Sequence, residues 1–353
     1  MDAAETPYFY TDMHMGTLET GKLKSEFLEQ ILGKIEIRDK RVVVGPGIGE
    51  DAAAIDIGES YLIVKSDPIT FVSDRIGWYV VNVNANDIAA MGGSPRWFLV
   101  TMLLPERRAT VRMLEDIMKD LRQACRELGI ELIGGHTEVT HGLSSPILSG
   151  TMLGEAAKGE LIRNVNISEG DILYITKGVA VEATSIIARE KKDEVLGTFG
   201  KDFYARCLEF LSVPGISVVK DAFRARNAAR VTGMHDPTEG GVLSGAYEMA
   251  RASGKGLEIF LDRIPVYPET ADLCRHFHLS PFSMIASGAL LISVPPEETA
   301  RLERAFGSRR ESAPPISRIG EFTARGDRFW IVEDGKRKAV HPTGIDDVTK
   351  LFV

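Results

Sequence analysis

The chain has 353 residues and a formal net charge of −8, and a length of this order predicts two domains. Its 44% hydrophobic and 26% charged residues are typical of a soluble globular protein. The acidic balance argues against broad nucleic-acid binding, which needs a basic face, and no apolar run reaches the roughly 18 residues of a membrane span.

The first half of the sequence reads as one α/β unit. Residues 1–17 lack the apolar core of a signal peptide, and we treat them as an N-terminal arm without an assigned function. After the arm we expect, in chain order, a helix at Leu23–Ile35, strands at Arg41–Val44 and Ser60–Val64, a helix at Ile76–Met91, a strand at Arg96–Leu104, a helix at Thr110–Leu128 and strands at Glu131–Ile133 and Pro146–Leu153. The run Ile76–Met91 is long, mostly apolar and ended by Gly92, which favours a buried helix over a strand.

A polar stretch, Gly154–Gly170, breaks this pattern, and we place a domain boundary near residue 158. The second half repeats the mixture of helices and strands. We expect, in chain order, a strand at Ile172–Thr176, helices at Glu182–Lys192, Asp202–Leu211, Ser217–Ala229 and Gly241–Ser253, strands at Leu257–Leu261 and Ala289–Val294, a helix at Glu297–Phe306, and strands at Ile316–Phe322 and Arg328–Val332. The expected fold class is mixed α/β in two domains, with ligand sites where the halves meet.

The cysteines predict no disulfide. Cys125, Cys207 and Cys274 form no CxxC pair, and apolar neighbours at helical spacing predict that each is a buried small hydrophobe. An odd count without a pairing pattern is typical of a reducing compartment, so we expect a cytoplasmic protein.

A glycine-rich stretch near the start, GPGIGEDAA at Gly45–Ala53, resembles no common phosphate loop. Its third glycine comes too early for GxGxxG, and no GxxxxGK[ST], HExxH or GxSxG occurs in the sequence. The usual nucleotide-loop and hydrolase motifs are therefore excluded.

Acids in unusual settings are the stronger signal. They are Asp51 after the glycine loop, Asp67 in KSDP, Asp87 in NANDIAAMG, Glu138 in GGHTEVT, and Asp236 and Glu239 in HDPTEGG. Taken singly, Asp87 is equally well explained as a helix acid hydrogen-bonded to an asparagine or a backbone amide, and Asp51 and Asp67 as turn residues. Taken together, acids beside glycines make an oxygen-rich site for Mg²⁺, which would neutralise a phosphate near the glycine backbone.

The histidines give weaker signals. His136 in GGHT is a ligand, an acid–base group or a hydrogen-bonded structural residue, and the sequence leaves these open. His235 stands next to Asp236, and we expect it to orient that acid. Zinc is not expected, because Cys and His residues lack ligand spacing.

The motifs GIGEDAA, KSDP, NANDIAAMGGSP, GGHTE and HDPTEGG occur in the order, and at about the spacing, of one family. From about residue 18 to the end, the chain resembles the aminoimidazole-ribonucleotide (AIR) synthetase-like ATP-binding proteins. This superfamily includes selenophosphate synthetase, thiamine-monophosphate kinase and the hydrogenase-maturation protein HypE, and the likeness is greatest to HypE-like members.

The resemblance implies two domains, residues 18–157 and 158–353. The N-terminal domains of two chains would pair into a shared β-barrel in a homodimer, with ATP in a cleft between the domains. Asp51, Asp67, Asp87 and Asp236 match the acids that bind magnesium and phosphate. Asp87, His136 and Glu138 are the candidate catalytic residues. The candidate nucleotide contacts are Gly47, Gly49, Lys65, Asn86, Thr137, Thr238, Gly240 and Gly241, the last two at a helix start that favours phosphate.

The sequence departs from the family in two places. His136 stands where GGDT carries an aspartate, and Glu138 is the candidate to replace that ligand, which leaves the metal count open. HypE ends in Pro-Arg-Ile-Cys, whereas this sequence ends GIDDVTKLFV, so we do not expect the chemistry of the HypE cysteine. Selenophosphate synthetase is disfavoured because its Cys- or Sec-containing segment has no counterpart before Gly45.

We therefore expect a Mg²⁺-dependent ATP-binding enzyme that hydrolyses ATP or transfers its phosphate to an oxygen of a small substrate. One alternative is thiamine-monophosphate kinase. Another is a nucleotide-binding protein without catalysis that serves a protein partner of the hydrogenase-maturation type.

Overall fold

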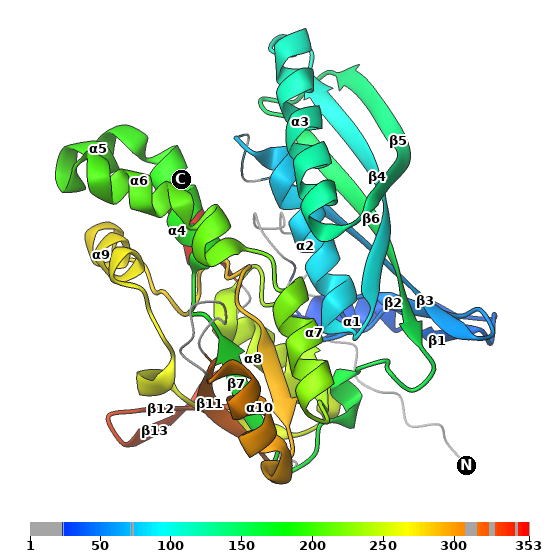
Figure 1. The fold of residues 1–353 in the computed structure, drawn as a ribbon. Coiled ribbons are helices and arrows are strands. Elements are labelled where there is room, and N and C mark those ends of the chain that lie inside the picture. The colour runs from blue at the N-terminus through cyan, green and yellow to red at the C-terminus, as the bar shows by residue number, and fades with distance from the viewer. Residues whose placement is uncertain are drawn as a thin grey trace, which may run out of the picture.

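The computed structural model describes residues 23, 25–70, 72, 74–307, 316–324, 329–342 and 345–352. The arm predicted at residues 1–17 lies outside these residues. The described chain forms two β-sheets, each with helices packed against it (Figure 1).

The first sheet has six strands in the order β1-β2-β3-β6-β4-β5, and only β4 and β5 run parallel. Its strands are β1 Val42–Val44, β2 Ala53–Asp56, β3 Ser60–Ile69, β4 Ser94–Pro105, β5 Glu131–Thr140 and β6 Ile147–Ala157. Three helices belong to this half: α1 Ser25–Leu32, α2 Ile76–Ala90 and α3 Val111–Leu128. Helix α2 lies against β3 and β6, with α3 beside it (Figure 1).

Helix α2 confirms the buried helix that the apolar run predicted, because all of its residues are buried. Its Gly77 is required by packing, since a Cβ there would lie 2.6 Å from the Ile117 carbonyl oxygen of α3. Buried asparagines in an apolar helix need partners, and Asn82 donates to the Trp78 carbonyl oxygen at 2.9 Å.

Two strands run further than the sequence predicted. Strand β3 continues through KSDP, and β5 continues through GGHTEVT, so Asp67 and His136 lie within strands and not after them. Pro68 is tolerated because β2 pairs with β3 only as far as Val64. Beyond that point β3 has a single neighbour among the described strands, and a proline at such an open edge removes no ladder hydrogen bond.

The second sheet has seven strands in the order β13-β12-β9-β11-β7-β10-β8, with only β12 and β9 parallel. Its strands are β7 Ile172–Thr176, β8 Gly233–His235, β9 Gly256–Phe260, β10 Leu291–Val294, β11 Ile316–Thr323, β12 Phe329–Glu333 and β13 Lys336–Ala339. The helices of this half are α4 Val181–Glu190, α5 Lys192–Phe199, α6 Lys201–Glu209, α7 Val219–Ala228, α8 Gly241–Ser253, α9 Pro268–Phe277 and α10 Thr299–Phe306.

The expected helix Glu182–Lys192 is confirmed as α4, which ends at Glu190, and the helix α5 that follows it was not predicted. Strands β2, β8 and β13 and helix α9 were not predicted. The cysteine prediction is confirmed, since Cys125, Cys207 and Cys274 are free and buried. No helix in the described ranges has the length and apolar character needed to cross a membrane.

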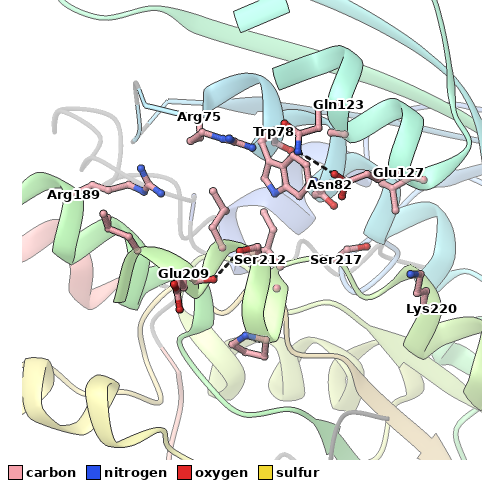
Figure 2. Close-up of a pocket in the computed structure, with 17 residues that line it drawn as sticks. Arg75, Trp78, Asn82, Gln123, Glu127, Arg189, Glu209, Ser212, Ser217 and Lys220 are labelled. Carbon is pink, nitrogen blue, oxygen red and sulfur yellow. Dashed lines mark hydrogen bonds between the residues drawn. The ribbon is translucent and has the colours of Figure 1, made fainter. Parts of the chain in front are cut away.

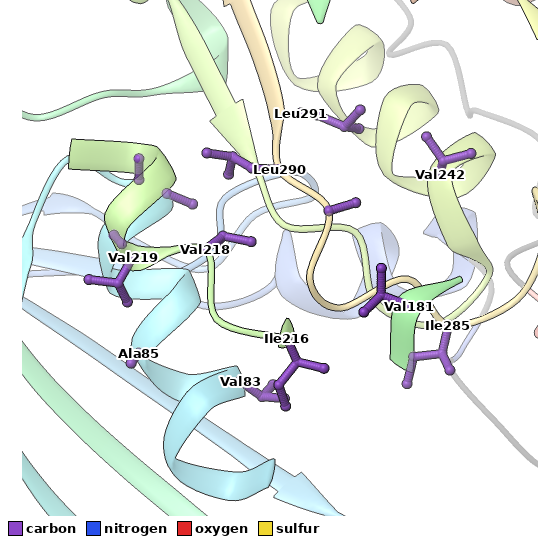
Figure 3. Packing of buried hydrophobic residues seen from close by; sticks show 14 of the residues in the cluster. Val83, Ala85, Val181, Ile216, Val218, Val219, Val242, Ile285, Leu290 and Leu291 are labelled. Atoms are coloured by element: carbon purple, nitrogen blue, oxygen red, sulfur yellow. The ribbon is translucent and has the colours of Figure 1, made fainter. Parts of the chain in front are cut away.

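The two halves meet along α2. Figure 3 shows Val83 of this helix beside Ile216, and Ala85 near Val219 of α7. All four side chains are buried, so the junction is an apolar contact of the kind that fixes two domains relative to each other.

Within the described residues the six-stranded sheet remains open, because β1 and β5 each have a single neighbour there. The barrel that the resemblance implied needs a second chain and stays a prediction.

Candidate functional site

Acids from separate segments of the chain surround the side chain of Lys65 on β3. Its Nζ lies 3.1 Å from Asp87 Oδ1 on α2 and 3.2 Å from Asp67 Oδ2 on β3. Burial alone would lower the pKa of Lys65, but the carboxylates of Asp87, Asp67, Asp51 and Asp236 outweigh it and raise this pKa. Lys65 is therefore a fixed positive charge within a larger group of acids.

A second set adjoins it where β8 ends. The Asp51 carboxylate contacts His235 Nδ1, and His235 Nε2 lies 3.4 Å from Glu248 Oε2 on α8. Burial would lower the pKa of His235, yet Asp51 and Glu248 raise it to about 10. His235 is thus an imidazolium at neutral pH and holds Asp51, whereas the sequence led us to expect that it orients Asp236.

Potential ligand atoms of Asp51, His235 and Asp236 lie within 4.8 Å of one another, and all three residues are buried; because the protonated His235 has no free lone pair, the two carboxylates are the ligands of this group. Among the described residues, neither carboxylate oxygen of Asp236 has a hydrogen-bond partner, and nor does Asp87 Oδ2. Burial raises the pKa of both acids well above the ordinary range, and neighbouring carboxylates raise it further. Unpartnered buried carboxylates are costly, and oxygen ligands of this kind suit Mg²⁺, so the residues fit a hard cation.

The glycine loop is docked on the second half of the chain. Gly49 has φ 75°, and a Cβ there would lie 2.6 Å from the Glu248 carbonyl oxygen. Asn164 Nδ2 donates to the Gly49 carbonyl oxygen at 2.8 Å, and Arg163 Nη2 donates to Glu50 Oε1 at 2.7 Å. Glu50 is therefore held in an ion pair, which leaves Asp51 as the acid of this loop that faces the cluster.

The backbone at the start of α8 adopts left-handed conformations. Gly240 and Gly241 have φ 78° and 68°, and a Cβ on Gly241 would lie 2.6 Å from the Phe282 carbonyl oxygen. The Gly240 amide donates to Asp346 Oδ2 at 2.9 Å, and the Gly241 amide donates to the Thr238 carbonyl oxygen at 3.0 Å. A phosphate at these amides would have to compete with Asp346.

Asp346 and Glu182 are buried acids near this helix start that the sequence reasoning missed. Burial raises the pKa of Glu182 to about 8 and that of Asp346 to about 7. Acids perturbed by burial concentrate at functional sites. The sequence signal available was slight: Asp346 sits in GIDD, and Glu182 is flanked by small apolar residues.

The two asparagines of the NAND motif have different structural roles. Asn86 donates from Nδ2 to the Ile216 carbonyl oxygen at 2.9 Å and accepts from the Val218 amide at 2.8 Å, so its amide clamps the two halves together. Asn84 accepts from the Asp67 amide at 2.9 Å and donates to the Asp67 carbonyl oxygen at 3.2 Å. Asn84, three residues before Asp87 and hence on the same side of the helix, fixes the backbone of the acid on β3.

The residues of GGHTE do not join the acids within one chain. His136 Nε2 lies 3.2 Å from Glu138 Oε2, and both side chains are exposed. Asp67 is in register with Gly150, Gly150 with Val100, and Val100 with Gly135. Three strand spacings put β5 roughly 14 Å from β3.

The GGHTE side chains and the acids also lie on opposite faces of the sheet. His136 is in register with Thr101, whose neighbour Val100 is buried on the side that α2 covers. Because side chains alternate along a strand, His136 and Glu138 point to the opposite face. Their predicted catalytic roles, and the nucleotide contact predicted for Thr137, stay predictions that need a second chain.

Comparisons with known proteins agree with this architecture. Residues 49–156 match the family model of the AIR synthase related protein N-terminal domain, and residues 168–332 match that of its C-terminal domain. A protein of Methanocaldococcus jannaschii named as a hydrogenase expression/formation protein is 27% identical over 80% of this chain and 82% of its own length. A selenide, water dikinase of Geobacter metallireducens is 30% identical over 70% of this chain and 68% of its own length.

Among solved structures, AaThiL in complex with AMPPCP and TMP superposes with a TM-score of 0.68 at 19% identity, covering 90% of this chain and 94% of that one. At this identity the superposition concerns the fold alone. With both domain models matched in order along its length, the chain belongs to the AIR synthase-related proteins.

Proposed function

We propose that this protein is a Mg²⁺-dependent ATP-using enzyme that hydrolyses ATP or transfers its terminal phosphate to an oxygen of a small substrate. The observation that carries the proposal is the convergence of Asp51, Asp67, Asp87 and Asp236, with three buried carboxylate oxygens that lack partners in the described structure. Two comparisons support the proposal. The chain belongs to the AIR synthase-related proteins, and a protein of the same fold was solved with the nucleotide analogue AMPPCP.

The residues divide into ligands and supports. Asp87 and Asp236 would hold the cation, which supplies charge neutralisation to the phosphates when bound. Lys65 holds Asp67 and Asp87 together, and His235 holds Asp51. Catalysis would come from positioning and from preorganised charge rather than from a covalent intermediate.

Calorimetry with ATP tests this proposal. Wild-type protein is expected to bind ATP in the presence of Mg²⁺, and Asp87→Asn is expected to weaken that binding about tenfold or more, because a charge-assisted contact is lost. Lys192→Gln, an exposed change on α5, is the control. Unchanged affinity in Asp87→Asn would remove this acid from the site.

The open face of the first sheet supports a homodimer. Five side chains on this face are apolar and only partly buried, namely Leu62, Val64, Leu99, Leu103 and Leu153. Such a face calls for a partner, and a second copy would bring another GGHTE strand to it. A monomer by light scattering at all working concentrations would overturn this part of the proposal.

Thiamine-monophosphate kinase is a second candidate, favoured by the fold likeness to AaThiL in complex with TMP. His136, in place of the aspartate of GGDT, weighs against it. Formation of thiamine diphosphate from thiamine monophosphate and ATP would establish this activity, and its absence alongside ATP hydrolysis would exclude it.

A nucleotide-binding protein without catalysis is a third candidate, favoured by the M. jannaschii relative named for hydrogenase expression and formation. A stable complex with a hydrogenase-maturation protein, together with no turnover of ATP, would support it. ATPase activity stimulated by a small substrate would contradict it.

A further inference from the structure

A cavity of about 540 Å³ opens between the two halves of the chain, apart from the acid cluster (Figure 2). Arg75, Trp78 and Asn82 line it from the start of α2, and Arg189 and Lys220 line it from the second half. Trp78 precedes Asp87 by nine residues, which is about 180° around a helix. The cavity therefore lies on the side of α2 away from Lys65, and its volume is typical of a small-molecule site.

Three buried polar atoms on the lining lack a hydrogen-bond partner among the described residues: Arg75 Nε, Trp78 Nε1 and Ser217 Oγ. Trp78 is only 9% exposed, and its indole points into the space, beside Asn82 (Figure 2). Arg75 Nε lies 3.3 Å from Asp120 Oδ1 without forming a hydrogen bond to it. Trp78 Nε1 is a donor only, and a buried unsatisfied donor is costly, so this nitrogen is short of an acceptor, whereas the Arg75 charge is already paired with Asp120.

Two guanidinium groups lie at this end of the cavity, and each is paired with an aspartate, Arg75 with Asp120 and Arg189 with Asp74. Arg189 contacts the carboxylate of Asp74, the residue before Arg75, and its Nε donates to Ser185 Oγ at 3.2 Å. The Arg75 Cζ lies 5.2 Å from the centre of the Trp78 ring. Arginines arranged in this way suit the planar oxygens of a carboxylate or phosphate.

The lining acids stand apart from this end. Glu127 accepts from Gln123 Nε2 at 3.1 Å, and Figure 2 shows Glu127 and Glu209 away from Arg75. Of the rest, six residues form an apolar wall, Ala124, Leu128, Leu208, Leu211, Pro214 and Ile216, beside the polar Asn82, Gln123, Ser212, Ser217 and Lys220. One end of the cavity thus favours an anion, and the apolar wall suits part of an organic body.

We propose that this cavity is a binding site for a small organic anion, in which Arg75, Arg189 and the Trp78 Nε1 donor hold a phosphate or carboxylate group and the apolar wall takes the remainder. The site touches the joint between the halves, because Ser217 lies between Ile216 and Val218, the two residues that bond Asn86. It is independent of the proposed phosphate transfer and does not use the acid cluster.

The sequence supplies a reporter for this site. The chain has three tryptophans, so the double variant Trp97→Phe/Trp330→Phe leaves Trp78 as the sole indole. Phenyl phosphate and sodium benzoate are titrated into this protein with EDTA present, and benzyl alcohol serves as the neutral analogue. The two anions distinguish a phosphate ligand from a carboxylate one.

Saturable change of Trp78 fluorescence is expected with at least one of the two anions. Arg189→Gln is expected to weaken this binding about tenfold or more, because hydrogen bonds to charged groups are the strong ones. Lys192→Gln on the surface and Asp87→Asn in the acid cluster are expected to leave it unchanged, which separates this site from the nucleotide site. Arg75→Gln, at the same end of the cavity, is expected to weaken this binding likewise and gives a second variant that does not depend on Arg189→Gln folding.

Three results would overturn the proposal. One is the absence of saturation with either anion at millimolar concentrations. Another is equal affinity for benzyl alcohol, which would show that charge is not recognised. The last is unchanged anion affinity in both Arg189→Gln and Arg75→Gln.

Discussion

Asp236→Asn is expected to make the metal-free protein more stable while it weakens nucleotide binding. Both carboxylate oxygens of Asp236 lack partners in the described structure, and burial, with Asp51 beside it, raises its pKa well above the ordinary range. In the unfolded chain this acid is ionised in water at neutral pH. Folding must therefore bury the charge or take up a proton.

The size of the effect follows from the free-energy cost of protonating Asp236 when the chain folds. At pH 7 this cost is about 1.4 kcal/mol for each pH unit above the pKa of the unfolded carboxyl, so it has an upper limit of about 4 kcal/mol. Asparagine keeps the shape but still leaves polar atoms without partners, which cost about 1–3 kcal/mol. A net gain of about 2 kcal/mol is expected, or a rise in Tm of roughly 4 °C.

Thermal unfolding in EDTA, followed by circular dichroism, measures this gain. Asp193→Asn, an exposed aspartate on α5, is the matched control and is expected to shift the Tm by much less. Addition of Mg²⁺ with ATP should stabilise the wild type more than Asp236→Asn, because binding to the folded state alone raises stability. A Tm in EDTA that is unchanged or lowered in Asp236→Asn would refute the reasoning that the acids are held at a cost for a cation.

Three further predictions concern the supports of the site. Asn86→Ala leaves the buried Ile216 carbonyl and Val218 amide without partners and is expected to cost about 3 kcal/mol in unfolding free energy, measured by chemical denaturation; a loss below about 1 kcal/mol would contradict the clamp. Gly49→Ala is expected to cost about 3 kcal/mol, because the added Cβ would lie 2.6 Å from the Glu248 carbonyl oxygen. Gly58→Ala, also at positive φ but with nothing within 4 Å, isolates the backbone term, and equal losses in the two variants would exclude the clash. Burial raises the pKa of Glu182 to about 8 from its ordinary 4.5, so the folded state holds the extra proton between these values and stability falls as pH rises through this window. The Tm of Glu182→Gln relative to wild type should therefore increase from about pH 5 to about pH 8, and a difference that does not change with pH would contradict the assignment.

The sequence predicted the secondary-structure elements that are determined by a local residue pattern. The apolar run that became α2 is long and ended by Gly92, and such a pattern determines a buried helix by itself. The acids of KSDP, NAND and HDPTEGG could also be singled out, because carboxylates beside glycines and within apolar helices are unusual. Their convergence followed from the family resemblance and not from any local pattern.

What the sequence could not predict depends on neighbours distant along the chain. Pro68 and Gly135 read as the ends of strands, yet β3 and β5 continue because β6 and β4 pair with them along their length. Asn84 and Asn86 look alike in the sequence. Because α2 lies between β3 and Val218, Asn84 bonds the backbone of Asp67 in the site, and Asn86 bonds the junction of the two halves.

The cavity at Trp78 was beyond sequence reasoning for the same reason. Trp78 and Arg189 belong to different halves of the chain, and no spacing rule connects them. The orphaned indole nitrogen becomes visible only when every buried donor is matched with an acceptor.

Binding of ATP with and without Mg²⁺, measured by calorimetry on wild type and Asp87→Asn, tests the central claim most directly. Wild type is expected to bind ATP with Mg²⁺, and to lose affinity about tenfold or more in EDTA, because the unneutralised acids then repel the phosphates. Asp87→Asn should reproduce most of that loss even with Mg²⁺ present. Equal affinity in all three conditions would contradict the account, since the acid cluster would then have no part in holding the nucleotide.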